Sequence, residues 1–379
     1  MPSTNLTAPT LITRMAQLRA FAGKLPKEPL LAVDTESNSL HAYQEQVCLI
    51  QFTISDGDYL VDPLSLDSLA PLAPFFADPK HEKIFHAAEY DLICLKRDFE
   101  FVFTNLFDTM FAARILGRKK VGLGSILEEE FHVIANKKYQ RADWGQRPLP
   151  SYLQAYAQLD THYLIPLRNR LGDQLHQKNL WSLAEEDFKR LCHVNGREPT
   201  PKEDLVWRIN GARDLSAGEA AVLNELCLYR DQMAAKLNRP VFKVMNDELL
   251  VKLAQHLPLD KAELVRAGMT ERQLHRFGEG VLAAISRGMA ASPLYQPVHP
   301  RPDDDYLARM EALTDWRKIR ARSLGVESDV VLPREHITKI ARANPAGGPD
   351  LLPLMEDVPW RYEHFNEQIL RVLKRVNRS

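Results

Sequence analysis

Two acidic side chains follow directly on an apolar run near the N-terminus. Residues 30–36 read Leu-Leu-Ala-Val-Asp-Thr-Glu. In a strand, Asp34 and Glu36 lie on the same face, because side chains alternate with period two. Burying ionised carboxylates costs roughly several kcal/mol for each group, unless a cation or hydrogen bonds compensate for that cost. The pair therefore indicates a metal site, although a strand that simply reaches solvent is the commoner explanation of Asp-x-Glu taken alone.

Two later segments contain further candidates of the same chemical type. In residues 85–91 (Phe-His-Ala-Ala-Glu-Tyr-Asp) an apolar strand gives way to a helix, and Asp91 lies in its first turns. Tyr156 and Asp160 are four residues apart, which places them on one face of a helix. Each segment also has a structural explanation. An Asp is favourable at a helix N-terminus, and Tyr beside Asp can be an ordinary hydrogen-bonded pair.

The three segments together resemble the exonuclease motifs of the DEDD superfamily, which has a ribonuclease H-like fold. Tyr156 marks the DEDDy branch, since the sister branch carries a histidine where this chain has Ala155. Residues 137–144 (Lys-Lys-Tyr-Gln-Arg-Ala-Asp-Trp), followed by Arg-Pro-Leu at 147–149, resemble the segment before the third motif in ribonuclease D. Two C-terminal helical repeats resemble HRDC domains. The chain is thus identified as a member of the ribonuclease D family.

The resemblance implies a site with two divalent ions, Mg²⁺ or Mn²⁺. Such ions, about 3.5–4 Å apart, supply a nucleophile and neutralise the leaving oxygen in phosphodiester hydrolysis. Mg²⁺ takes hard oxygen ligands, which suits carboxylates and argues against zinc. By resemblance Asp34 bridges both ions, Glu36 and Asp160 complete the ion that activates water, and Asp91 acts on the other through waters. Tyr156 hydrogen-bonds the attacking water, because a phenol with a pKa near ~10 orients better than it deprotonates.

Substrate contacts are predicted just before the third motif. Basic and aromatic residues interleave there, as suits the phosphates and bases of a single strand. The predicted contacts are Lys137, Gln140, Arg141, Trp144 and Arg147. A second basic run between Arg114 and Lys120 is explained equally well by substrate binding and by a solvated face. The same two explanations apply to the basic C-terminal tail, and His86 is predicted to be structural.

The elements that must position these side chains follow from periodicity and turn signals. Strands are expected at 30–36, 47–54 and 59–61, and a hairpin turn at 55–58 makes them a three-stranded meander. Helices and strands then alternate, with helices expected at 66–76, 88–97, 109–116 and 126–131 and a strand at 83–86. Asp108 is expected to open the helix at 109–116. A long helix over 150–171 is expected to kink at Pro166. The predicted fold is an α/β ribonuclease H-like exonuclease domain, a mixed sheet flanked by helices, followed by two all-α HRDC-like domains.

The C-terminal half repeats itself. Tyr229-Arg230 corresponds to Trp316-Arg317 and Leu250 to Ile337, both at an offset of 87 residues, and one inserted residue aligns Phe277 with Phe365. Polar, proline-containing stretches at 195–204 and 292–302 are the expected linkers. The predicted domains are 1–195 (exonuclease), 206–292 (first HRDC) and 303–379 (second HRDC-like).

The composition sets bounds on partners and compartment. The 379 residues carry 49 basic and 50 acidic side chains, so a nucleic-acid surface must be local. Four widely spaced cysteines exclude zinc-ribbon and thioredoxin-type motifs. No apolar run is long enough to span a membrane. We expect a cytoplasmic monomer without an obligate protein partner.

The combined prediction is a metal-dependent 3'-to-5' exoribonuclease. It would release 5'-mononucleotides from RNA 3' ends, with tRNA precursors as the substrates that the family implies. One alternative is a DNA exonuclease of the helicase-associated type, since the catalytic acids do not distinguish the sugar. The other is a non-catalytic nucleic-acid-binding module, which the presence of all four carboxylates disfavours.

Overall fold

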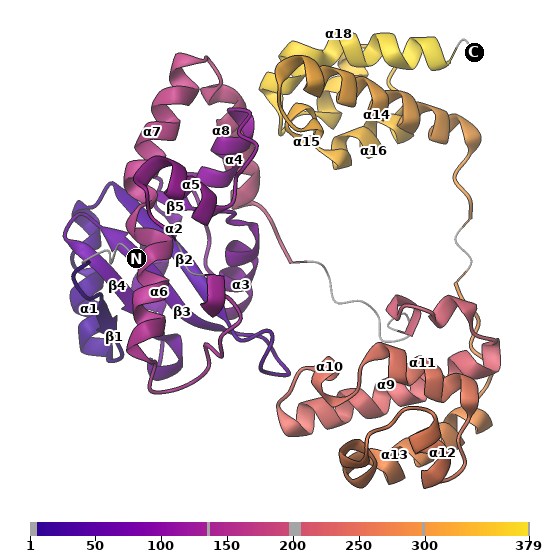
Figure 1. The fold of residues 1–379 in the computed structure, drawn as a ribbon. Coiled ribbons are helices and arrows are strands. Elements are labelled where there is room, and N and C mark those ends of the chain that lie inside the picture. Colours follow the sequence, from indigo (N-terminus) through magenta and orange to yellow (C-terminus); the bar gives the residue numbers. More distant parts are fainter. Residues whose placement is uncertain (1–5, 135–136, 197–205, 298–299, 378–379) are drawn as a thin grey trace. The chain divides into compact units, whose positions relative to one another are not determined.

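The computed structural model describes residues 6–134, 137–196, 206–297 and 300–377 (Figure 1). The chain divides into two compact units. One comprises residues 1–37, 47–196 and 301–379, and the other comprises residues 38–46 and 197–300. Among the helices of the described residues, none combines the length and apolar character needed to cross a bilayer.

The N-terminal domain is built on a six-stranded mixed sheet with the order β1-β4-β3-β2-β5-β6. The antiparallel ladder β2-β3-β4 is the predicted meander, and β1, β5 and β6 join it in parallel. Strand β1 was not predicted, because three residues are too short to show a period. The strands are β1 (Thr10–Ile12), β2 (Leu30–Ser37), β3 (Val47–Ile54), β4 (Gly57–Val61), β5 (Glu82–Phe85) and β6 (Leu106–Asp108).

Helices cover both faces of this sheet (Figure 1). On one face, Leu31 and Val33 of β2 pack in the same core as Leu92 of α3. On the other face, Leu49 of β3 packs with Tyr156 and Ala157 of α6. The helices of the domain are α1 (Met15–Ala22), α2 (Ala73–Ala77), α3 (Glu89–Phe99), α4 (Thr109–Ile115), α5 (Leu123–Phe131), α6 (Ser151–His162), α7 (Leu164–Gln177) and α8 (Trp181–Cys192).

The predicted long helix is two helices, and the break is not at Pro166. Helix α6 ends at His162 and α7 starts at Leu164, so Pro166 lies in the first turn of α7. A proline costs little there, because the first N–H groups of a helix have no intrahelical acceptor. The helix expected at 66–76 is also shorter than predicted, with α2 covering only Ala73–Ala77 and a 3₁₀ turn, Ala70–Leu72, before it.

Two helical modules follow, and they are copies of one design. We call residues 206–297 the first module and residues 300–377 the second module. The offset of 87 residues relates α9 to α14, α10 to α15 and α11 to α16 at both ends of each helix. The first module contains α9 (Ala217–Leu237), α10 (Val241–Val244), α11 (Asp247–His256), α12 (Lys261–Arg266) and α13 (Glu271–Ala290). The second contains α14 (Asp304–Leu324), α15 (Ser328–Val331), α16 (Arg334–Ala343), α17 (Gly348–Leu351) and α18 (Pro359–Val376).

The predicted repeat extends to single hydrogen bonds. Arg230 donates to the Met245 carbonyl at 3.1 Å, and the corresponding Arg317 donates to the Leu332 carbonyl at 3.0 Å. This bond ties the first helix of each module to the end of its short second helix. The fold class predicted from the sequence, an α/β domain followed by two helical modules, is confirmed.

The second module packs against the N-terminal domain through a buried arginine. Arg361, in the first turn of α18, is fully buried and forms ion pairs of 2.8 Å with both Glu186 and Asp187 of α8. The same Glu186 carboxylate accepts the backbone N–H groups of Trp360 and Arg361. The start of α18, a site of unpaired N–H groups and positive dipole, is thereby capped by the other domain.

Candidate active site

Strand β2 delivers the first two carboxylates as the strand period predicts. Leu31 and Val33 point into the core shared with α3, so Asp34 and Glu36 point to the opposite face, toward α6. Asp34 lies opposite Gln51 of β3, and Glu36 lies opposite Leu49. The apolar half of β2 is therefore anchored in the core, and its end presents two acids to a cleft.

Helix α6 brings the third carboxylate and the phenol to the same place. Asp34, Glu36 and Asp160 each offer an oxygen within 4.8 Å of the others. Tyr156, one turn before Asp160, is 9% exposed and lines the same cleft of about 480 Å³. Residues separated by more than a hundred positions thus converge as predicted.

The fourth carboxylate, Asp91, is buried in the first turn of α3. Its Oδ1 accepts the hydroxyl hydrogen of Thr35, which lies between the two acids of β2. The Thr35 side chain points to the α3 face of the sheet, so this bond ties α3 to β2 at the level of the site. Thr35 was not singled out from the sequence, because a threonine in a strand is usually a packing residue.

Asp108 holds the turn before Asp91, although the sequence predicted it only as the start of a helix. Asp108 is fully buried, and its carboxylate accepts the N–H groups of Ala88 at 2.7 Å and Met110 at 2.8 Å. Ala87 has a φ of 64° and also donates to Asp108, at 3.3 Å. One side chain therefore caps α4 and fixes the strained turn before α3.

His86 and Gln140 also line the cleft that contains Asp34, Glu36 and Asp160. The ring of His86 is 2.9 Å from the Thr109 hydroxyl, and burial lowers the pKa of His86 to about 4. This histidine is neutral at physiological pH and has the structural contact predicted for it, although it also faces the cleft. The Gln140 side chain hydrogen-bonds Tyr156.

The four carboxylates fit divalent cations. Burial and mutual repulsion raise the pKa of Asp34 and Glu36 well above the usual range, and burial raises the pKa of Asp91 and Asp160 to about 7. Within the described ranges, no lysine, arginine or histidine forms an ion pair with these four acids. A donor set of oxygens alone, with uncompensated charge, matches Mg²⁺ or Mn²⁺ rather than zinc.

Two of the predicted substrate contacts take a supporting position instead. The Trp144 side chain is only 1% exposed and packs in the core with Tyr156, so it offers no face to a base. Arg147 forms two 2.7 Å bonds to the buried Asp62 and donates to the carbonyls of Cys48 and Trp144. The prediction of direct substrate contact is therefore wrong for Trp144 and Arg147. Their side chains instead stabilise the segment before α6.

The remaining predicted contacts have different outcomes. Gln140 lines the cleft, and Arg141 is exposed. The Lys137 side chain lies outside the part of the chain that the structure describes. In the other basic run, Arg114 pairs with Glu327 and Asp329 of the second module, and Arg118 pairs with Glu130. These two arginines form ion pairs within the protein. Neither substrate binding nor a solvated face, the two explanations considered for this run, describes them.

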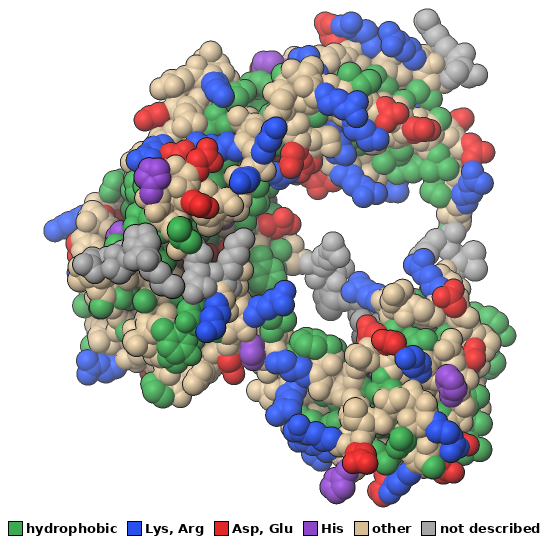
Figure 2. Space-filling model, in the orientation of Figure 1, with side chains coloured by type: hydrophobic (Ala, Val, Ile, Leu, Met, Phe, Trp, Pro, Cys, Tyr) green, Lys and Arg blue, Asp and Glu red, His purple; other side chains and the backbone are tan. Residues whose placement is uncertain are grey.

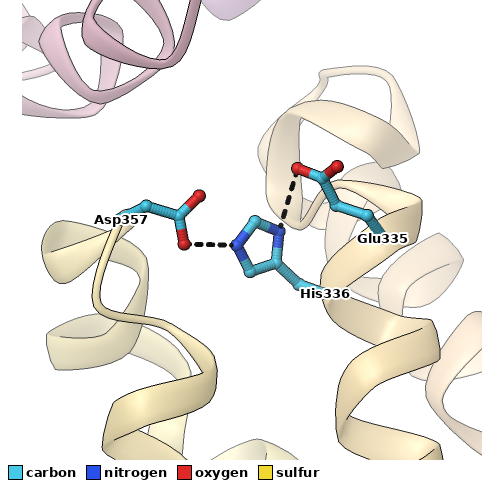
Figure 3. Close-up of side chains that lie close together, drawn as sticks. All are labelled: Glu335, His336 and Asp357. Atoms are coloured by element: carbon cyan, nitrogen blue, oxygen red, sulfur yellow. Dashed lines mark hydrogen bonds and ion pairs between the residues drawn. The ribbon is translucent and has the colours of Figure 1, made fainter. Parts of the chain in front are cut away.

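A second group of metal-ligand types lies in the second module, but a guanidinium already serves it. Figure 3 shows His336 between Asp357, 2.9 Å from Nε2, and Glu335, 3.8 Å from Nδ1. Arg190 of α8 forms ion pairs with both of these carboxylates. The negative charge is therefore partly compensated, and the cluster is part of the contact between α8 and the second module.

A cleft larger than the one lined by Asp34, Glu36 and Asp160 also lies beside this contact. It has a volume of about 860 Å³ and is lined by α8, α16 and α18. Carboxylates predominate in its wall, among them Glu185, Glu335, Glu356 and Glu363. Negative charge of this kind repels phosphates, so size alone does not make it the site.

Comparison with known proteins agrees with this geometry. The family model described as 3'-5' exonuclease matches residues 9–176, and that of the HRDC domain matches residues 219–285 and 307–373. "Protein RRP6-like 1" of Arabidopsis thaliana is 31% identical over 76% of this chain. The chain spans between 31% and 47% of the length of three such Arabidopsis proteins.

Relatives of similar length cover nearly the whole chain. "Ribonuclease D" of Jannaschia sp. is 28% identical, and the match includes 96% of this chain and 95% of that protein. The crystal structure of Escherichia coli RNase D has the same fold, with a TM-score of 0.71, 24% identity and coverage of 97% and 99% of the two chains. With an exonuclease domain followed by two HRDC domains, the chain belongs to the ribonuclease D family.

Proposed function

We propose that the protein is a metal-dependent 3'-to-5' exoribonuclease that removes 5'-mononucleotides from RNA 3' ends. The observation that carries this proposal is the convergence of Asp34, Glu36 and Asp160 within 4.8 Å, beside Tyr156 and in one cleft. Ribonucleases D match the chain over most of its length, and exosome exonuclease RRP6 of Saccharomyces cerevisiae is 31% identical over 70% of it.

Asp34, Glu36, Asp91 and Asp160 would together hold two divalent ions. When bound, the ions supply a hydroxide-like nucleophile and neutralise charge on the departing 3' oxygen. The chain's own task is to orient the reactants. Burial and the nearby carboxylates raise the pKa of Tyr156 far above its usual value, so its phenol stays protonated and can donate a hydrogen bond or accept one from the attacking water.

Gln140 and Arg141 remain the proposed contacts with the substrate, and Lys137 stays a proposal from the sequence. Gln140 hydrogen-bonds Tyr156 and lines the cleft, which supports its proposed contact with the terminal nucleotide. Precursors of tRNA are the proposed substrates, in the cytoplasm and without an obligate protein partner. The proposed domain boundaries are 1–195, 206–292 and 303–379.

A side-by-side degradation assay tests the proposed polymer. Matched 5'-labelled single-stranded RNA and DNA of one sequence are incubated with the protein and Mg²⁺, with EDTA as the control. We expect a ladder of shortened RNA, faster than for DNA, which EDTA abolishes. Equal or faster shortening of DNA would favour the helicase-associated type of DNA exonuclease, and shortening in EDTA would refute the role of metal ions.

A further inference from the structure

The two helical modules are copies of one fold, yet one equivalent face has opposite chemistry in each. In the first module this face is a cleft of about 280 Å³ between α10 and the start of α13. Four exposed cationic side chains line it, which we call the basic cleft: Arg239, Lys243, Arg272 and Arg276. Among the residues that the structure describes, no carboxylate lines it. In Figure 2, Lys and Arg side chains gather on the part of this module that carries α10 in Figure 1.

The charges of the basic cleft are not neutralised by carboxylates of the described residues, although Arg276 also lies over the Phe277 ring, 5.9 Å from its centroid. Other cations of the first module have carboxylate partners, as Lys252 has Glu248 and Arg287 has Glu225. Within the described residues, no ion pair involves any of the four cations of the basic cleft. Uncompensated like charges around one hollow repel one another, and an anionic ligand relieves that repulsion.

The backbone adds to the positive potential of the cleft. Helix α13 is 20 residues long, and its N-cap Thr270 and its third residue Gln273 line the cleft. The first turn of a long helix carries unpaired N–H groups and the positive end of the dipole, which favour phosphate. Phe242, next to Lys243, is 50% exposed and offers an aromatic surface beside the charges. Cations with an exposed aromatic ring suit a polynucleotide strand.

The second module shows what the same face does when it is not basic. The offsets of the repeat place Val326, Val330 and Trp360 where the first module has Arg239, Lys243 and Arg272. Val330 belongs to the hydrophobic core of the N-terminal domain, and Val326 and Trp360 pack against that core. Arg361, at the position of Gln273, forms the buried pairs with α8. One face has therefore become a protein contact in one copy and a charged surface in the other.

We propose that the basic cleft binds the phosphate backbone of the RNA substrate, at a distance along the strand from the nucleotide that is cleaved. This inference rests on the proposed function for the identity of the polymer. The second module does not share this role, because its equivalent face is covered by the N-terminal domain. Of the two repeats, the first alone would then hold RNA through this face.

The test measures RNA binding separately from cleavage. The full chain with R239Q, K243Q, R272Q and R276Q is compared with a matched control, K252Q, K261Q, R266Q and R287Q. The control removes the same charge from the same module, at positions paired with carboxylates. All eight side chains are exposed, and circular dichroism checks that both proteins are folded. Affinity for a single-stranded 30-nucleotide RNA is measured in EDTA, from 50 to 200 mM salt.

The cleft variant is expected to bind at least about tenfold more weakly than the control. The slope of log affinity against log salt concentration should be smaller in magnitude by about 3 for the cleft variant. Each phosphate contact with a single strand contributes ~0.7 to this slope, and four cations are removed. Hydrolysis of a dinucleotide with Mg²⁺, which needs only the active site, should stay at the wild-type rate. Equal affinity and slope in the two variants would overturn the proposal, as would complete competition by polyglutamate of equal charge. If the wild type binds RNA through the cleft but cleaves nothing, the proposed function fails and this site stands.

Discussion

Replacing Arg361 by methionine should release the second module from the N-terminal domain. The guanidinium is fully buried and pairs with two carboxylates, Glu186 and Asp187, whose side chains are 5% and 4% exposed. It also donates to the Val330 carbonyl at 2.9 Å. Removing one partner of a buried ionic group leaves uncompensated charge, which costs about 3–5 kcal/mol. Since ~1.4 kcal/mol is tenfold, the undocked population should rise at least about a hundredfold.

Hydrogen–deuterium exchange of the amides in α8 and in the first turns of α18 measures this opening directly. The control is Arg317→Met, the same substitution in the same module. Within the described part of the chain, the Arg317 guanidinium has one hydrogen-bond partner, the Leu332 carbonyl of its own module. R361M should speed exchange in both helices by about the same hundredfold, whereas R317M should leave α8 unchanged. Unchanged exchange in α8 of R361M would refute the view that this arginine holds the contact.

Three further predictions concern the active site. Asp108→Ala should lower the free energy of unfolding by about 3 kcal/mol in urea denaturation, because it leaves the Ala88 and Met110 N–H groups without their acceptor; a loss below ~1 kcal/mol would contradict its role. Tyr156→Phe should reduce kcat at least about tenfold with little change in RNA affinity, and an unchanged kcat would remove the orienting role. Asp91 and Asp160 have pKa values of about 7 in the folded protein, so between pH ~4 and ~7 the folded state holds protons that the unfolded state releases. The unfolding free energy of the metal-free protein should therefore fall as pH rises through this window. The increase in Tm caused by Mg²⁺ should be larger at pH 8 than at pH 5.5, and an equal increase at both would contradict the assignment of these ligands.

The sequence predicts the acids of the site because short-range periodicity decides where they point. Strand alternation fixes Asp34 and Glu36 on one face, and helical spacing fixes Tyr156 one turn from Asp160. That the three segments meet is a property of the sheet order, which no local pattern contains. The family resemblance supplied that step, and the register of β2 against β3 and β5 now gives its structural basis.

Side chains whose role depends on burial were the ones predicted wrongly. Trp144 and Arg147 lie among basic and aromatic residues, a composition typical of nucleic-acid contacts. The sequence does not show that Arg147 pairs with Asp62, which lies 85 positions earlier in the chain. Arg361 shows the same limit. In an amphipathic helix it resembles any surface arginine, and only the tertiary contact with α8 makes it a core residue. Asp108 was predicted to start a helix. Its hydrogen bonds to the Ala87 turn were not predicted, because they depend on the pairing of the neighbouring strands β5 and β6.

The two modules show how much a repeat can and cannot reveal. The equal lengths of the first three helices in each module and the matched bonds of Arg230 and Arg317 follow from the repeated pattern. Their different surroundings do not, because the residues that differ lie on the outer face, where the helical period tolerates any side chain. The opposite character of that face became evident only once its contacts were known.

We propose that the four carboxylates form a metal-dependent site that shortens RNA from its 3' end. The most direct test of this proposal is the degradation of a 5'-labelled single-stranded RNA by the wild type and by Asp34→Asn, with Mg²⁺ and with EDTA. We expect a ladder of progressively shorter products from the wild type with Mg²⁺ alone, and none from D34N, which should still bind the RNA. A ladder from D34N at the wild-type rate, or from the wild type in EDTA, would contradict the account.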